Sequence, residues 1–274
     1  MNAEGPVRLA VCEAAVGMTP EDNNWRSLAT DASDKKADMF LLNEMPFGRW
    51  VAAANEPQFD DLVAVQRLHE QGLAKYQDLG TPVVLGSHPV FQEGNSVIEG
   101  FVWEQESGVT PAHTKQFFPN EEGWYETLWF ERGDQAFEIV EVGGLNVGFL
   151  ICTDIMFNEW ARYYGREGAD LIVVPRATPV ATLHRWQAAI QMAAVVSGCY
   201  VASSNRAGEE EGVTFGGQGW IVDPSGVVIA ETSADEPVVA ADIYRSVAAH
   251  AKREYPCYVD DTPPLDPETL TDEL

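Results

Sequence analysis

The stretch 146-NVGFLICTDIMFNEWARYYG-165 joins an apolar run to a segment with helical spacing, and one cysteine lies between them. The run Val147–Ile151 predicts a buried strand, and the apolar residues after Cys152 recur mostly at helical intervals. Cys152 would then lie near a helix N-terminus, where the dipole and free amide groups stabilise a thiolate and can hold an oxyanion. Free cysteines are also common as small buried hydrophobes, so this stretch alone leaves both interpretations open.

Around this stretch, apolar strands alternate with helical patterns. Further strands are predicted at Val7–Val16, Asp38–Leu42, Pro82–Val90, Ser96–Glu104, Val109–His113, Phe137–Val142, Asp170–Val174, Tyr200–Ser203, Gly217–Val222, Val227–Glu231 and Pro237–Asp242. Helices are predicted at about Pro20–Ala32, Phe59–Tyr76, Met156–Glu167, Pro179–Val196 and Ile243–Arg253. Helices stand where crossovers between parallel strands need them, which favours a layered α/β fold with mixed sheets. We expect a single domain over residues 1–255 and an acidic, Pro-rich tail over 256–274.

The charge of the chain excludes some partners. Its 43 acidic and 17 basic residues give a formal net charge of −26. Such a surface repels phosphate backbones and anionic lipid, so we expect neither nucleic-acid nor membrane binding. The first residues carry Glu4 and Glu13 without a basic start, which is unlike a signal peptide. No apolar run approaches the length of a membrane span.

The spacing of the cysteines indicates the redox state of the compartment in which the protein is expected. Cys12, Cys152, Cys199 and Cys257 are widely separated and form no CxxC pair. This pattern argues against a zinc cluster or a disulfide framework and favours a reducing compartment. We therefore expect a cytoplasmic protein.

Two charged residues upstream stand in contexts that suit catalysis. Glu44 follows an apolar run in 40-FLLNEMPFG-48, and carboxylates at the ends of strands often face a site. Lys115 opens an aromatic segment within 113-HTKQFFPNEEGWYE-126. A thiolate usually takes histidine as its proton acceptor, but no histidine falls in a motif that pairs with Cys152. Glu44 is equally suited to a salt bridge, and Lys115 to simple exposure.

In this order, the segments resemble the nitrilase superfamily of carbon–nitrogen hydrolases, which has a Glu–Lys–Cys triad. Glu44 follows an apolar strand, Lys115 precedes a Pro…Gly-x-x-Glu pattern that ends at Glu126, and Cys152 precedes Asp154. Further landmarks are 169-ADLIVVP-175, 204-SNR-206 and 216-GGQGWIVDPSG-226. The resemblance implies a four-layer α-β-β-α sandwich, usually paired into a dimer or a larger homo-oligomer, with no metal and no organic cofactor.

The resemblance also implies roles. Cys152 would attack an amide-like carbon and form a thioester. The ammonium of Lys115 and the N–H of Thr153 would stabilise the oxyanion. Glu44 would act as general base and then as general acid. Glu126 would orient the substrate or Lys115.

The residues around the nucleophile bear on the reaction. True nitrilases tend to carry Cys-Trp-Glu, whereas this chain has Cys152-Thr153-Asp154, which is closer to amidases and carbamoylases. We therefore expect hydrolysis of a small amide or N-carbamoyl compound that releases ammonia, with nitrile hydrolysis as the alternative.

Two residues are candidates for substrate binding. Arg176 could pair with a substrate carboxylate or form a structural salt bridge. Trp124 could line an aromatic pocket or belong to the core.

Two alternative functions belong to other classes of protein. A class I glutamine amidotransferase would need a downstream His–Glu pair, which we do not find. A catalytically silent binding protein would be expected to lack part of the triad, whereas all three members are present.

Overall fold

The computed structural model describes residues 5–92, 94–133 and 137–261. Its strands are β1 (Val7–Ala15), β2 (Met39–Glu44), β3 (Val83–Gln92), β4 (Asn95–Glu104), β5 (Gly108–Thr114), β6 (Val140–Val142), β7 (Leu145–Phe149), β8 (Leu171–Pro175), β9 (Tyr200–Glu210), β10 (Val213–Gly216), β11 (Trp220–Val222), β12 (Val228–Glu231) and β13 (Val238–Ile243). Its α-helices are α1 (Asn23–Lys35), α2 (Phe59–Leu73), α3 (Glu126–Trp129), α4 (Asn158–Glu167), α5 (Leu183–Ser197) and α6 (Arg245–Ala251). Short 3₁₀ helices are η1 (Val51–Ala53), η2 (Tyr76–Leu79), η3 (Cys152–Met156) and η4 (Val180–Thr182).

The strands form two mixed halves that meet at one seam. The order is β5-β4-β3-β2-β1-β9-β8-β7-β6, with β13 added beside β1, β10 and β11 beside β9, and β12 beside β11. Strands β1, β2 and β3 run parallel, as do β7, β8 and β9. Among the described strands, the halves pair directly where the end of β1 lies beside β9, over Glu13–Ala15 and Asn205–Ala207. Each half of the sheet has two faces, and both must be covered by other parts of the fold to bury their apolar side chains.

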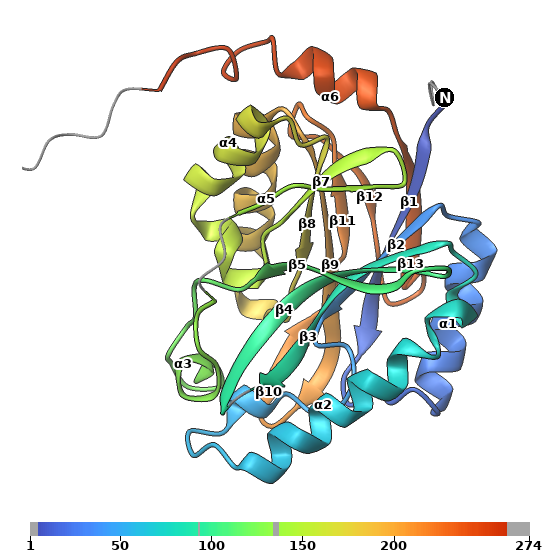
Figure 1. The fold of residues 1–274 in the computed structure, drawn as a ribbon, viewed down its shortest axis with the longest axis vertical. Helices are drawn as coiled ribbons and strands as arrows, with labels where there is room; N and C mark the ends of the chain where they lie inside the picture. The colour runs from blue at the N-terminus through green and yellow to red at the C-terminus, as the bar shows by residue number, and fades with distance from the viewer. Residues whose placement is uncertain (1–4, 93, 134–136, 262–274) are drawn as a thin grey trace, which may run out of the picture.

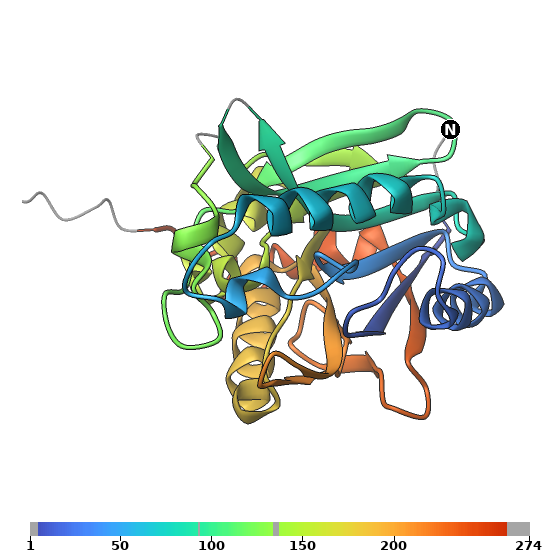
Figure 2. The same ribbon diagram turned by 90° about the horizontal axis from the view of Figure 1, so that it is seen from below.

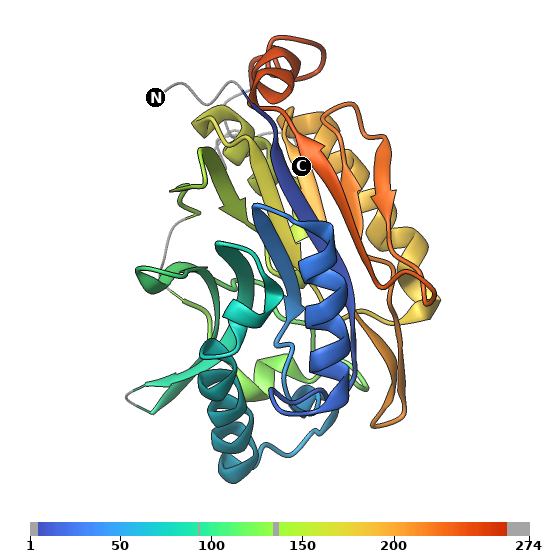
Figure 3. The same cartoon turned by 90° about the vertical axis from the view of Figure 1, so that its right-hand side faces the viewer.

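The layers follow from where the apolar residues lie. One core packs side chains of β1, β2 and β3 against those of β7, β8 and β9, so the two halves face each other. A second core packs α1 against its half, and a third packs α4 and α5 against the other half. Figure 1 shows α4 and α5 on one side of the strands and α1 on the other, Figure 2 shows the same layers from below, and in Figure 3 α1 lies in front. The predicted four-layer α-β-β-α sandwich is confirmed.

Several boundaries differ from the predictions for local reasons. The first helix begins at Asn23 rather than Pro20, because the Asp22 side chain accepts the N–H of Trp25 and caps it there. The strand predicted from Phe137 is reduced to Val140–Val142. The strand from Tyr200 continues to Glu210 and forms a hairpin with β10, which the sequence reading missed. The single-domain prediction stays a prediction, and residues 262–274 of the expected tail lie outside the described residues.

Candidate active site

Strand ends bring three predicted residues together. Glu44 is the last residue of β2, Lys115 directly follows β5, and Cys152 opens η3 shortly after β7. All three side chains are buried. Glu126, the first residue of α3, is buried beside them. Residues more than 100 positions apart in the chain thus share one site.

The Lys115 ammonium lies between two carboxylates. Its Nζ donates to Glu44 Oε1 at 2.7 Å and to Glu126 Oε2 at 2.5 Å. Burial alone lowers the pKa of Lys115, but the charges of Glu126 and Glu44 outweigh it and raise that pKa well above its usual value. Burial raises the pKa of Glu126 to about 8, although Lys115 opposes the rise. The lysine is therefore a fixed cation.

Cys152 stands at a strained turn. Its φ is +48°, a left-handed value that a non-glycine residue seldom adopts, and such strain is often found at functional sites. Burial raises the pKa of the Cys152 thiol well above its usual value, Glu44 raises it further, and Lys115 lowers it. In the resting protein Cys152 is therefore a thiol and needs a base to become a nucleophile.

Two carboxylate oxygens in this group accept no hydrogen bond from the described residues. Glu44 Oε2 and Glu126 Oε1 are both buried, while the other oxygen of each residue holds Lys115. A buried acceptor without a partner is costly. Both atoms are thus available to a substrate N–H, a thiol proton or a water molecule.

Asp154 fixes the segments that carry Lys115 and Cys152. Its Oδ1 accepts the N–H groups of Gln116 at 3.2 Å and Phe117 at 3.0 Å. Its Oδ2 accepts the N–H of Ile151 at 3.1 Å and lies 3.0 Å from His113 Nε2, which carries the proton opposite a carboxylate. The sequence analysis used Asp154 only as a landmark of the family and as a residue that favours amidases over nitrilases. It gave His113 no role, because nothing local in the sequence shows that the two side chains meet.

Replacing Asp154 with asparagine should slow catalysis more than it weakens binding. The amide NH₂ group would face two N–H donors whichever way the side chain is turned, so one segment must shift. We expect kcat to fall by about 10- to 100-fold, since small displacements of reacting groups have effects of this size. Steady-state kinetics checks this, with thermal unfolding as the control for folding.

Asp170→Asn is the matched control. Asp170 is also buried and accepts a backbone N–H, from Asn146 at 3.0 Å, but it pairs with Arg245 away from the triad. A positioning role for Asp154 predicts that only Asp154→Asn lowers kcat. Equal kcat values in the two variants would contradict it.

A pocket opens onto this group. Its volume is about 210 Å³, and it is lined by Pro119, Glu121, Trp124, Glu126, Cys152, Thr153, Met156, Ala177, Pro179, Thr182, Arg185 and Trp186. Trp124 lies in the wall and packs against Trp50 and Phe215, with ring centroids 5.5 and 5.4 Å away. Thr153 lies beside the nucleophile. The pocket offers an apolar wall and a polar, reactive floor.

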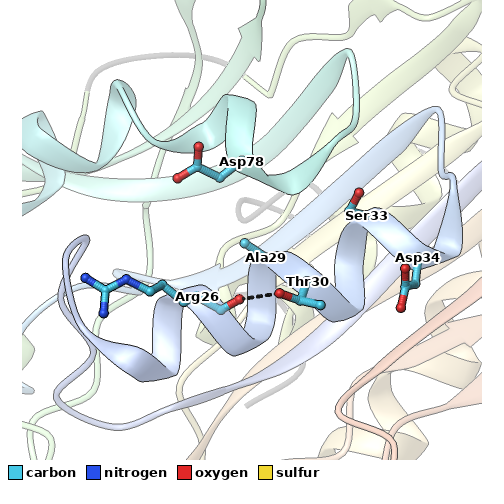
Figure 4. A pocket seen from close by; sticks show the side chains of 6 residues that line it. All are labelled: Arg26, Ala29, Thr30, Ser33, Asp34 and Asp78. Atoms are coloured by element: carbon cyan, nitrogen blue, oxygen red, sulfur yellow. Dashed lines mark hydrogen bonds between the residues drawn. The ribbon is translucent and has the colours of Figure 1, made fainter.

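A larger depression, of about 410 Å³, lies elsewhere and carries no comparable chemistry. Figure 4 shows it between α1 and η2, with Asp78 on η2 and Arg26, Ala29, Thr30, Ser33 and Asp34 on α1. The Thr30 hydroxyl donates to the backbone oxygen of Arg26 within the helix. Its lining contains no cysteine and no buried ion pair, so the smaller pocket is the candidate active site.

Arg176 has internal hydrogen-bond partners, and its expected role in substrate binding stays a prediction. Its guanidinium is buried, and it donates to Ser203 Oγ at 2.8 Å and Thr178 Oγ1 at 2.5 Å, and to the backbone oxygens of residues 217 and 218. The group also stacks 4.1 Å from the Trp220 ring centroid. All of its nitrogens are thus used inside the protein, and Arg176 is not among the residues that line the pocket. The arginine that lines the pocket is Arg185, nine positions further along the chain.

In the described part of the chain, no group of three or more His, Cys, Asp or Glu residues is arranged to hold a metal ion. No helix there is both long and apolar enough to cross a membrane.

Comparison with known proteins identifies the family of this chain. The sequence pattern of the carbon–nitrogen hydrolases matches residues 14–253. The omega-amidase of Xenopus tropicalis is 31% identical over 91% of this chain and 92% of its own. The chain belongs to the carbon–nitrogen hydrolase family and is an enzyme of the nitrilase superfamily, as the sequence predicted.

Two solved structures share the fold. A carbon–nitrogen hydrolase from Helicobacter pylori G27 superposes with a TM-score of 0.85 and 21% identity, covering 98% of this chain and 100% of that one. A variant of the amidase from Nesterenkonia sp. AN1 superposes with a TM-score of 0.74 and 21% identity, over 92% of this chain and 97% of that one. That variant carries the acetamide moiety of fluoroacetamide, covalently added at its active-site cysteine.

Proposed function

We propose that this protein hydrolyses a small linear amide or N-carbamoyl compound to an acid and ammonia through a thioester on Cys152. The observation that carries the proposal is the buried Lys115, which is held between Glu44 and Glu126 beside a cysteine at a strained turn. A fixed cation beside a thiol and a carboxylate suits attack on a carbonyl, where negative charge develops on oxygen. The amidase relatives support the same reaction class.

In the first half-reaction, Glu44 takes the thiol proton on its unpartnered Oε2 as the sulfur attacks the carbonyl carbon. The Lys115 ammonium and the N–H of Thr153 stabilise the oxyanion that forms. The C–N bond then breaks, and Glu44 returns the proton to the leaving nitrogen. Ammonia departs and leaves an acyl thioester on Cys152.

In the second half-reaction, Glu44 removes a proton from water, which attacks the thioester carbon at the same oxyanion site. The C–S bond breaks, the acid is released and the proton returns to the sulfur. Glu126 keeps one oxygen on Lys115 and offers Oε1 to the substrate nitrogen. Because Glu44 performs each proton transfer, no histidine is required, and none lines the pocket among the described residues.

A substrate panel distinguishes amide from nitrile hydrolysis. We expect ammonia release from short aliphatic amides or from N-carbamoyl compounds, with kcat/KM at least about tenfold higher than for nitriles of the same chain length. The expectation rests on Cys152-Thr153-Asp154, which differs from the Cys-Trp-Glu typical of nitrilases. Ammonia and acid are quantified in parallel. Turnover confined to the nitriles would reverse the assignment.

We also propose a homodimer or a larger homo-oligomer in the cytoplasm. Large apolar side chains exposed on α4 and α5, including Tyr163 and Met192, support assembly. The four free cysteines support a reducing compartment. Light scattering should give at least twice the mass of one chain, and a monomer mass at all concentrations would contradict assembly. The expected absence of metal, cofactor, nucleic-acid and membrane partners stays a prediction.

A further inference from the structure

The motif 204-SNR-206 of β9 takes no part in the proposed reaction, although it lies at the seam where β9 pairs with β1. All three side chains are buried, whereas serine, asparagine and arginine are mostly exposed in proteins. Ser204 Oγ donates to the Leu41 oxygen at 2.6 Å, and Asn205 Oδ1 accepts the Thr178 N–H at 2.9 Å. The motif thus connects β9 to β2, which carries the proposed general base, and to the segment after β8 that lines the pocket.

Arg206 holds the backbone directly after Glu44. Its Nη2 donates to the Met45 oxygen at 2.7 Å, and its Nη1 donates to the Gly48 oxygen at 3.3 Å. Met45 has a φ of +43°, a left-handed value that a non-glycine residue seldom adopts. Such a conformation persists only where its surroundings fix it. The guanidinium therefore helps to fix the turn by which the chain leaves the proposed general base.

The Arg206 guanidinium is itself held by Glu210. Glu210 Oε2 accepts Arg206 Nη1 at 2.7 Å and the Trp50 N–H at 2.9 Å. The ring centroids of Trp50 and Phe215 lie 5.7 and 5.5 Å from Arg206 Cζ. Burial lowers the pKa of Arg206, and the charges of Glu210 and Glu44 oppose this fall. An ion pair and two aromatic rings thus hold the guanidinium in one place.

We propose that Arg206 is a positioning residue that, through Met45, holds Glu44 where it can take the thiol proton. This inference rests on the proposed role of Glu44 as general base in thioester formation on Cys152. Two other contacts locate Glu44: its Oε1 accepts Lys115 Nζ at 2.7 Å, and its N–H donates to a backbone oxygen after β8 at 3.3 Å. Arg206 fixes the chain on the opposite side of Glu44, so the three contacts together set where the unpartnered Oε2 lies.

Steady-state kinetics tests this role. Arg206→Met should lower kcat by about 10- to 100-fold and leave KM within about threefold of the wild type, because Arg206 does not line the pocket and only the base is displaced. Arg206→Lys should recover part of the lost kcat, since an ammonium keeps the charge but cannot replace a planar guanidinium at both Met45 and Glu210. Denaturant unfolding shows whether each variant is folded. A loss confined to KM would contradict the proposal, and so would an unchanged kcat.

Alkylation of Cys152 tests the positioning without amide turnover. Iodoacetamide reacts with a thiolate, and the buried thiol needs Glu44 to lose its proton. Peptide mass spectrometry gives the rate at Cys152 alone, and we expect Arg206→Met to lower it by about tenfold or more. Because Arg206 acts through Glu44, the same substitution should have no further effect in a Glu44→Gln background. An equal slowing in both backgrounds would overturn the proposal. If Arg206→Met does not fold, Arg206→Lys is used in the same cycle, with an expected slowing of at least about threefold.

Arg8→Gln is the matched control. Arg8 likewise donates to a backbone oxygen, that of Lys35 at 2.9 Å, and pairs with a carboxylate, Asp242 at 2.9 Å, but it does not line the pocket. Its replacement should leave both kcat and the alkylation rate unchanged.

The two assays separate this inference from the proposed function. If the wild type hydrolyses no amide but the alkylation rates still show that Arg206 acts through Glu44, the reaction assignment fails and the positioning role stands. If amides are hydrolysed and folded Arg206→Met is alkylated at the wild-type rate, only the positioning role fails.

Discussion

Cys152→Ala is expected to lower amide hydrolysis by about 10⁴-fold or more, because loss of the nucleophile removes the covalent route altogether. The fold should persist, since alanine is smaller than cysteine and the hydrogen bond of the thiol to the Ala177 oxygen is long, at 4.0 Å. Ammonia release from the best substrate of the panel measures the loss. Circular dichroism and thermal unfolding show whether the variant is folded.

Cys199→Ala is the matched control for this experiment. Cys199 is also a fully buried thiol and donates to the Ala169 oxygen at 3.0 Å, but it belongs to the core between α5 and its sheet. We expect Cys199→Ala to retain catalysis while it loses some stability. Substantial turnover by Cys152→Ala would refute the mechanism, and so would a failure to trap an acyl group on Cys152 by mass spectrometry during turnover.

Lys115→Met should affect both catalysis and stability. The ammonium stabilises the oxyanion, and removing one such donor costs about 10²–10³ in kcat. It also pairs with the buried carboxylate of Glu44, and breaking a buried ion pair from one side costs about 3–5 kcal/mol. Denaturant unfolding at pH 7 and steady-state kinetics measure the two effects separately. An unfolding free energy within 1 kcal/mol of the wild type would contradict this account.

The sign of the pH dependence supports the choice of pH 7. The pKa of Lys115 is raised in the folded protein, so its contribution to stability is complete below its unfolded pKa and is lost as the pH rises through the folded pKa. At pH 7 the full effect is present. Lys75→Met serves as the control, because Lys75 pairs with Glu21 at 3.0 Å on the surface. Such exposed pairs contribute at most about 1 kcal/mol.

The triad contexts could be predicted because they are local. One apolar run ends at Glu44, and another ends just before Cys152. Each run predicts a strand and shows which residue follows its apolar part. Carboxylates at strand ends often face a site, but the resemblance to the nitrilase superfamily was what joined these residues into one predicted site. The segment between Lys115 and Glu126 has little regular structure, and there the family resemblance rather than periodicity supplied the roles.

The hydrogen-bond network around Asp154 could not be predicted from the sequence. His113 lies 41 positions away and contributes through a single ring nitrogen. No spacing rule connects a histidine at the end of one strand with an aspartate in the turn after another. The contact depends on the packing of the two halves of the sandwich, which is a property of the whole fold.

The sequence by itself determined the fold class, the family and the segments in which Glu44, Lys115 and Cys152 lie. Strand ends, apolar periodicity and family motifs can each be read from short stretches of sequence. Only the tertiary structure decided between two arginines nine positions apart. Arg176 follows β8 and is drawn inward by carbonyls, hydroxyls and the Trp220 ring, whereas Arg185 reaches the pocket from the first turn of α5. Arg176 is held by partners on β9 and β11, and Arg185 is placed by the packing of α5 against the strands, so both positions depend on contacts between segments that the sequence keeps apart.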